Sequence, residues 1–189
     1  MLLAIREYKI TPGQAKWLQN FQWQNFKSSY GQGLLNDISD KGMFVFPTHH
    51  QVWDHNKIKL LKVSQSNPIA KLSAISKGIH ANSMESDRAD GLQQILFLCK
   101  NAKVMLTTHL CVAFGLFNGA TGTIIDLIYR NESQPEHYLP DVVMVQFDNY
   151  SGSPFIEENP KMFLIVPVER KIDCNCCGCR RQQIPLRFG

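Results

Sequence analysis

The cysteines are the residues whose types and spacing come nearest to a metal site. Four of the six lie together as Cys-Asn-Cys-Cys-Gly-Cys, at positions 174, 176, 177 and 179, and contain two overlapping C-x-x-C pairs. A structural zinc site usually takes one such pair from each of two separated segments, and four thiolates from one hexapeptide would be cramped around a tetrahedral ion. Cys99 or Cys111 could add only a single thiol each. We therefore favour a reduced, solvent-facing loop over a zinc site and assign no metal ligands.

Nucleotide chemistry would require a phosphate-cradling G-x-x-x-x-G-K-[ST] loop, and this chain contains no Gly-Lys dipeptide. It also contains no Asp-Glu pair, the usual metal-holding acidic motif of such enzymes. The glycines of Asn-Gly-Ala-Thr-Gly, at 118–122, lack the following lysine and are interpreted as turn glycines. We assign no catalytic residues and no cofactor to this chain.

Basic side chains, which could bind phosphates, are concentrated at the C-terminal end. The net charge is +4, yet residues 1–160 hold 14 Lys plus Arg against 14 Asp plus Glu. The excess therefore lies within 161–189, where six basic residues face two acidic ones. Such an asymmetry suits a nucleic-acid surface, although charged residues along a solvated strand edge would give the same count.

Composition predicts a folded globular protein, with 44% hydrophobic and 19% charged residues over 189 positions. The N-terminal run Met-Leu-Leu-Ala-Ile reaches Arg6 after too few apolar residues for a signal-peptide core. We therefore expect an intracellular protein with reduced cysteines.

A stretch without formal charge occupies residues 104–125 and is long enough to span a bilayer as a helix. Its histidine, asparagine, four threonines and three glycines argue against a membrane span. Two buried strands at 103–108 and 122–129, joined by a turn at Asn-Gly-Ala-Thr-Gly, explain it better.

Helix signals occur twice in the N-terminal third. Thr11 as N-cap, Pro12 and Gln14 form a capping box, followed by apolar residues at near-helical spacing that predict a buried face. A short apolar run at 43–46 predicts a buried strand, and a second capping box at Thr48 opens a helix that continues to Val63. A strand, a tight turn and a helix form the repeating unit of an α/β domain.

Five short strands are predicted in the C-terminal half, separated by turn residues. They are expected at 103–108, 122–129, 142–147, 163–168 and 183–188, with one more strand near 70–75 in the preceding polar segment. Short strands at this spacing suit a small SH3-like or OB-like barrel.

Several ordered blocks carry a resemblance to a known family. They read MFVFPTHHQVWDHN, AKVMLTTHL, GLFNGATGTI, LPDVVMVQFDNYSG, IVPVER and RRQQIPLRF. In this order they resemble the C-terminal part of Pif-type, RecD-like, superfamily-one ATP-dependent DNA helicases, over roughly 34–188. The chain departs from the family pattern at His109, where asparagine is common, and at Cys111, where an aromatic residue is common.

The resemblance implies an α+β protein: a partial RecA-like α/β segment followed by a small SH3-like β-barrel. The expected divisions are 1–33, an N-terminal helical segment; 34–90, a remnant of the second RecA-like domain with its linker; and 91–189, the inserted SH3-like subdomain. The resemblance also implies that the intact helicases use ATP and Mg²⁺. It further implies roles in DNA repair, recombination and telomere maintenance, in the nucleus or mitochondrion.

Single-stranded DNA is the partner that the resemblance implies, and we expect no membrane contact. Groups suited to grip phosphates or stack on bases are Lys103, His109, Asn118, Arg180 and Arg181. Asn118 has a competing structural explanation, since asparagine tolerates the left-handed geometry of a turn with Gly119. We expect a DNA-contacting helicase fragment without ATPase motifs, with a stand-alone protein-interaction adaptor as the alternative.

Overall fold

The computed structural model describes residues 2–20, 42, 44–130, 139–173 and 178–188. By its internal contacts the chain divides into two units, Met1–Thr48 and His49–Gly189.

The first unit contains helices α1 (Leu2–Arg6) and α2 (Pro12–Gln19). The predicted capping box is confirmed: the Gln14 amide N–H donates to Thr11 Oγ1, and the Thr11 amide donates to the Gln14 side chain at 3.0 Å. The predicted buried face is wrong for α2, because none of its residues is buried and Trp17 is 47% exposed. The strand predicted at 43–46 is absent from the described residues 44–46, since a strand requires a neighbour to accept its backbone hydrogen bonds.

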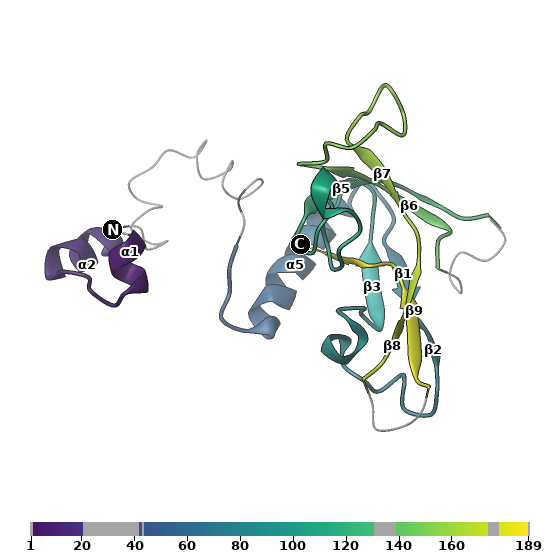
Figure 1. Ribbon diagram of the computed structural model, residues 1–189, viewed down its shortest axis with the longest axis horizontal. Coiled ribbons are helices and arrows are strands. Elements are labelled where there is room, and N and C mark those ends of the chain that lie inside the picture. The colour runs from purple at the N-terminus through teal and green to yellow at the C-terminus, as the bar shows by residue number, and fades with distance from the viewer. Residues whose placement is uncertain (1, 21–41, 43, 131–138, 174–177, 189) are drawn as a thin grey trace. The chain divides into compact units, whose positions relative to one another are not determined.

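The second unit is a mixed helix and strand structure, consistent with the α+β prediction (Figure 1). Its main helix is α5 (His49–Val63), which begins directly after the predicted cap. The described part has ten strands and two 3₁₀ turns: β1 (Ala70–Ser73), β2 (Ile75–Lys77), η1 (Ser86–Ala89), β3 (Ile95–Leu98), β4 (Lys103–Leu106), η2 (Val112–Phe114), β5 (Thr121–Ile128), β6 (Val142–Phe147), β7 (Met162–Ile165), β8 (Val168–Lys171), β9 (Arg180–Gln183) and β10 (Leu186–Phe188).

The largest sheet has the antiparallel order β10-β4-β5-β6-β7. The charge-free stretch supplies β4, the following loop and β5, which confirms the predicted strand pair, and Val104 lies opposite Gly122. A Cβ atom at Gly122 would meet Gln146 O at 2.7 Å, so the close approach of β6 requires glycine there. No helix in the described ranges is long and apolar enough to cross a membrane.

Two smaller antiparallel sheets complete the unit, with orders β2-β9-β8 and β1-β3. The described strands therefore form three open sheets instead of one closed barrel. The segment after β7 divides between two sheets, because β9 pairs with β2 and β8 while β10 returns to β4. Strands from 70–77 also pair with strands beyond position 90, so the structure has no division at the predicted boundary of 90.

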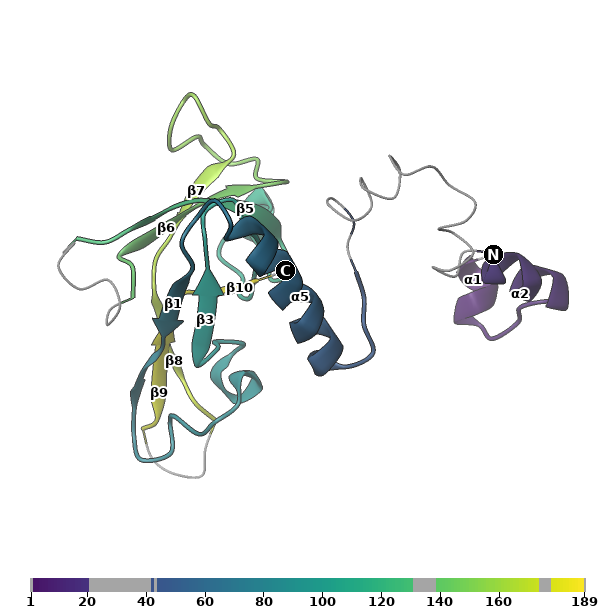
Figure 2. The ribbon, with the colours of Figure 1, turned by 180° about the vertical axis from the view of Figure 1, so that it is seen from behind.

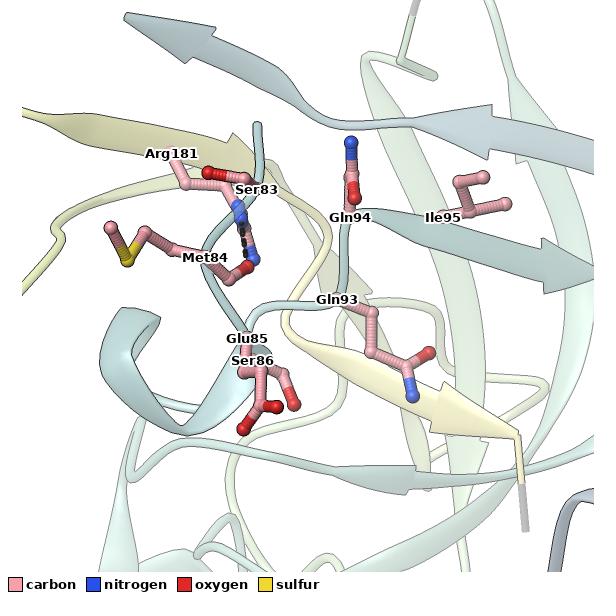
Figure 3. A pocket seen from close by; sticks show the side chains of 8 residues that line it. All are labelled: Ser83, Met84, Glu85, Ser86, Gln93, Gln94, Ile95 and Arg181. Atoms are coloured by element: carbon pink, nitrogen blue, oxygen red, sulfur yellow. Dashed lines mark hydrogen bonds between the residues drawn. The ribbon is translucent and has the colours of Figure 1, made fainter. Parts of the chain in front are cut away.

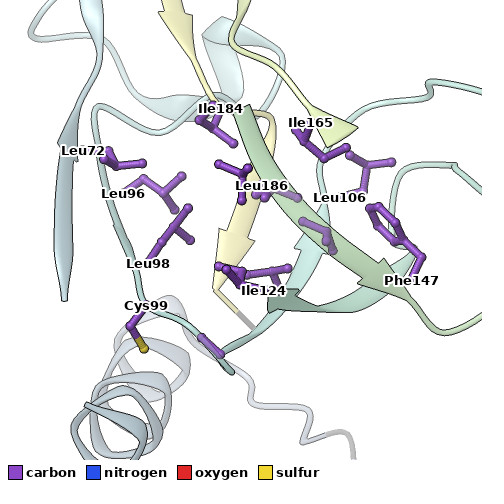
Figure 4. Packing of buried hydrophobic residues seen from close by; sticks show 14 of the residues in the cluster. Leu72, Leu96, Leu98, Cys99, Leu106, Ile124, Phe147, Ile165, Ile184 and Leu186 are labelled. Atoms are coloured by element: carbon purple, nitrogen blue, oxygen red, sulfur yellow. The ribbon is translucent and has the colours of Figure 1, made fainter. Parts of the chain in front are cut away.

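One apolar core joins the five-stranded and two-stranded sheets (Figure 4). Inward residues of β1, β3, β4, β5, β6, β7 and β10 fill it, including Leu72, Leu98, Leu106, Phe147 and Leu186. Buried positions alternate with less buried ones along β6 and β9, which is the period of two that a half-buried strand requires.

Helix α5 covers part of this core through a few contacts with β3 and β10 (Figure 2). Leu60 is its buried residue, and the Trp53 ring packs against Phe97 with centroids 6.1 Å apart. The Asn56 side-chain amide donates to Phe188 O at 2.9 Å, which attaches the helix to the last strand.

Arg181, on β9, is fully buried and binds the backbone of the segment that crosses beneath it. Its guanidinium donates to Leu92 O at 2.9 Å, Ala81 O at 2.8 Å and Met84 O at 2.7 Å. Burial lowers the pKa of Arg181, because desolvation disfavours the charged form, but an arginine still stays protonated. Gln183, two residues further on the same face, donates to Leu72 O and Gln93 O.

We predict that Arg181→Met destabilises the protein by about 3 kcal/mol, because three buried carbonyls lose a charged donor at once. Arg180→Met is the matched control, since Arg180 is exposed on the same strand and its surface ion pair contributes at most about 1 kcal/mol. Urea unfolding of both variants measures the difference. Equal midpoints for the two variants would contradict the structural role of Arg181.

Candidate nucleic-acid interface

The loop between β4 and β5, residues 109–118, folds into a compact projection that we call the knuckle. Cys111 and Leu116 form an isolated antiparallel bridge at its base. The Cys111 amide donates to Leu116 O at 2.9 Å, and the Leu116 amide donates back to Cys111 O at 3.0 Å. The 3₁₀ turn η2 forms the tip.

Backbone contacts next to its base and at η2 hold the knuckle in place. The Gly119 amide donates to Leu106 O at 2.8 Å, and the Ser151 amide donates to Phe114 O at 3.1 Å. Gly115 ends η2 with φ of +84°, and a Cβ atom there would collide with Asn149 O. A left-handed conformation packed this tightly against another backbone accepts only glycine without strain.

Three apolar side chains of the knuckle are exposed, whereas its Leu116 is buried in the main core. Val112 is 61% exposed, Phe114 47% and Phe117 39%. These exposed residues were not predicted, because a charge-free stretch is typical of buried strands joined by a turn. Gly115 and the Asn-Gly turn were the sequence features that could have predicted this exposure. A loop that doubles back over so few residues cannot bury all its side chains.

The structure brings the predicted residues His109 and Asn118 together at the base of the knuckle. Both are exposed, and the backbone N–H of Asn118 donates to His109 Nδ1 at 3.4 Å, which is a long hydrogen bond. The left-handed turn explanation for Asn118 does not apply, because Gly119 takes the positive φ of +102° and Asn118 does not.

Lys103 lies at the start of β4, the strand that leads into the knuckle. Its Nζ is 3.5 Å from Asp148 Oδ1, while Thr121 Oγ1 donates to Asp148 Oδ2 at 2.6 Å. Lys161 Nζ donates to the backbone carbonyl of Asp148 at 2.8 Å, so one lysine contacts the carboxylate of Asp148 and the other its main chain. Exposed pairs of this kind are weak, and a phosphate can compete for either lysine. Asp148 is three residues from Ser151, which binds the knuckle, so the two features are at most about 11 Å of chain apart.

The predicted residues Arg180 and Arg181 lie on the three-stranded sheet, and only Arg180 is accessible. Arg180 donates to Glu169 Oε1 at 2.8 Å, and this hydrogen bond, together with the charge of Lys77, lowers the pKa of Glu169. Arg181 is 0% exposed and its donors serve three carbonyls. We correct its assignment from a DNA contact to a structural residue, because a buried guanidinium cannot reach a phosphate.

A pocket of about 280 Å³ opens beside Arg181 and is separate from the knuckle (Figure 3). Its lining is mostly uncharged: Ser83, Met84, Glu85, Ser86, Gln93, Gln94, Ile95 and Arg181. With Arg181 engaged by backbone carbonyls, Glu85 is the one remaining ionisable side chain in this lining. A single carboxylate without a second acid, base or nucleophile does not form a catalytic constellation.

No group of three or more His, Cys, Asp or Glu side chains that could hold a metal occurs within the described ranges. Cys174, Cys176 and Cys177 lie outside those ranges, and Cys179 is buried. Cys99 is also buried, and desolvation raises the pKa of its thiol, which disfavours the thiolate that a metal would bind.

Comparisons with known proteins show structural but not sequence similarity. No family model and no curated protein matches the sequence. The structure is similar to unliganded Pif1 from Bacteroides sp, with a TM-score of 0.59 and 17% identity over 99% of this chain and 37% of that one. Bacteroides Pif1 bound to ssDNA gives a TM-score of 0.50 at 17% identity, over 100% of this chain and 37% of that one.

The Pif1 helicase from Candida albicans gives a TM-score of 0.55 at 18% identity, over 76% of this chain and 33% of that one. This chain therefore spans about a third of the length of the solved helicases it matches. At these identities the similarity concerns the fold alone, and the chain has the fold of part of a Pif1 helicase.

We predict that Gly115→Ala destabilises the protein by at least about 1 kcal/mol more than Gly119→Ala. Both glycines have positive φ, but a Cβ at Gly119 meets nothing within 4 Å, whereas one at Gly115 meets the Asn149 carbonyl. The difference isolates the contact between the knuckle and the loop after β6. Thermal or urea unfolding measures it, and identical losses in the two variants would contradict the described packing.

Proposed function

We propose that this chain is a helicase-derived module that contacts single-stranded DNA through the knuckle. The observation that carries the proposal is the exposure of Phe114 and Phe117 beside His109 and Asn118 on a chain with a Pif1 helicase fold. Exposed aromatic rings can stack on unpaired bases, and the adjacent polar groups can bind phosphate or base edges. Lys103 adds a cation within reach of the same strand.

The fold similarity supports assigning the second unit to an inserted SH3-like subdomain next to the end of the second RecA-like domain. In this proposal, ATP and Mg²⁺ act on the rest of a helicase, and this part only holds the strand. Roles in DNA repair, recombination or telomere maintenance, in the nucleus or mitochondrion, extend the same proposal. One of the matched Bacteroides Pif1 structures is bound to ssDNA, which supports the choice of ligand.

A protein-interaction adaptor is the second candidate, because Val112 and Phe114 also form an exposed apolar tip. Salt concentration distinguishes the two functions. Release of counterions makes DNA binding weaken steeply as salt rises, whereas an apolar protein interface depends on salt much less.

We predict that the double variant Phe114→Ala and Phe117→Ala binds a labelled oligothymidine strand at least about 10-fold more weakly, since base stacking contributes about 1–3 kcal/mol per base. Phe155→Ala is the matched control, because Phe155 is 63% exposed on a different loop. Fluorescence anisotropy at about 50 and 200 mM salt measures both affinity and its salt dependence. Unchanged binding by the folded double variant would remove the knuckle from the DNA site.

We also predict that the purified chain shows no DNA-stimulated ATP hydrolysis, because its sequence contains no Gly-Lys dipeptide to cradle phosphates. Phosphate release is measured with and without single-stranded DNA, against heat-treated protein as control. Release above that control would show an ATP site that the motifs do not explain.

A further inference from the structure

Three cations form one row across the three-stranded sheet. In the strand register, Arg180 on β9 lies opposite Lys77 on β2 and opposite Lys171 on β8. All three side chains are exposed, so they share the outer face, while the neighbouring Arg181 points inward. We call Lys77, Arg180 and Lys171 the basic row. With strands about 4.8 Å apart, it extends about 10 Å across the sheet.

Like charges directly opposite one another on adjacent strands destabilise a sheet, so this row carries an energetic cost. Glu169, two residues before Lys171 on the same face, offsets part of it. Its Oε1 is 2.8 Å from an Arg180 nitrogen, and its Oε2 is 3.6 Å from Lys77 Nζ. Across the described residues, no carboxylate lies within 4.0 Å of Lys171. One carboxylate therefore pairs with two of the three cations, and the row keeps an excess of positive charge.

The chemistry around the basic row suits phosphates and not bases. The next row of the same face consists of Ile75, Gln182 and Glu169, and contains no aromatic side chain. Without a ring to stack on, a base gains little from this face, whereas a line of phosphates gains charge pairing. Duplex DNA presents its phosphates outward at one charge per about 1.7 Å of axis and needs no unpaired base.

We infer that the outer face of β2-β9-β8 binds the phosphate backbone of duplex DNA through the basic row, with Glu169 as an internal competitor. The site lies on a different sheet from the knuckle, and it does not depend on the proposed function. Contact with the duplex requires Arg180 to leave Glu169, so the carboxylate weakens binding while it stabilises the free protein.

The test uses the full chain, a labelled blunt duplex and a labelled oligothymidine strand in anisotropy titrations over a range of salt. Lys171→Ala is expected to lower the slope of log affinity against log salt for the duplex by about 0.9, as one phosphate contact is lost. Arg180→Ala is expected to lower this slope in the same way. Glu169→Gln is expected to bind the duplex more tightly with a steeper slope, because two cations are released.

Lys71→Ala is the matched control, since Lys71 is exposed on the separate strand β1. The inference holds if the row variants weaken duplex binding while Lys71→Ala and the Phe114→Ala, Phe117→Ala double variant do not. It is overturned if Lys171→Ala and Arg180→Ala bind the duplex as the unmodified protein does, or if Glu169→Gln binds no more tightly. The inference is also overturned if Lys171→Ala and Arg180→Ala lose binding to anionic phospholipid vesicles while their binding to the duplex stays intact.

Discussion

The interaction on which the second unit depends is the set of hydrogen bonds from the buried Arg181 guanidinium. The segment between β2 and β3 is polar and contains little regular structure, so its carbonyls need partners when it is covered. Arg181 supplies donors to Ala81, Met84 and Leu92, and Gln183 supplies donors to Leu72 and Gln93. A charged donor is costly to bury, and several strong acceptors offset that cost.

This arrangement explains why the linker and the C-terminal strands form one unit. Strand β9 pairs with β2 on one edge and with β8 on the other, and its inward side chains hold the loop that leads to β3. A division at position 90 would cut through these contacts. The stability of the three-stranded sheet therefore rests on side chains far apart in the sequence.

The two candidate nucleic-acid surfaces differ in their side-chain chemistry and in the structure that holds those side chains. The knuckle offers aromatic rings and neutral polar groups, and it is held by backbone hydrogen bonds next to its base and at Phe114 and by the close packing of Gly115 against Asn149. The basic row offers charge alone, on a flat sheet face with one carboxylate among three cations. Stacking needs unpaired bases, and charge pairing does not, so the two surfaces would respond to different forms of DNA.

Much of the local structure could be predicted from the sequence. The capping box at Thr11, the helix that ends at Val63 and the strand pair around Asn-Gly-Ala-Thr-Gly all follow from contacts within a few residues. Such signals are local, because a cap or a tight turn uses only its neighbours. The predicted barrel is not observed in the described strands, because pairing between distant strands such as β2 and β9 leaves no local signal.

The adjacent residues Arg180 and Arg181 show the same limit at the level of function. The sequence alone determined that both occupy a polar strand. Neighbouring residues of a strand lie on opposite faces, so only one of the two arginines can face the interior. It did not determine which face is buried, since that depends on the segment packed against β9. Only the tertiary structure decided that Arg181 supports the fold while Arg180 faces solvent, because burial is set by residues about 90 to 100 positions away.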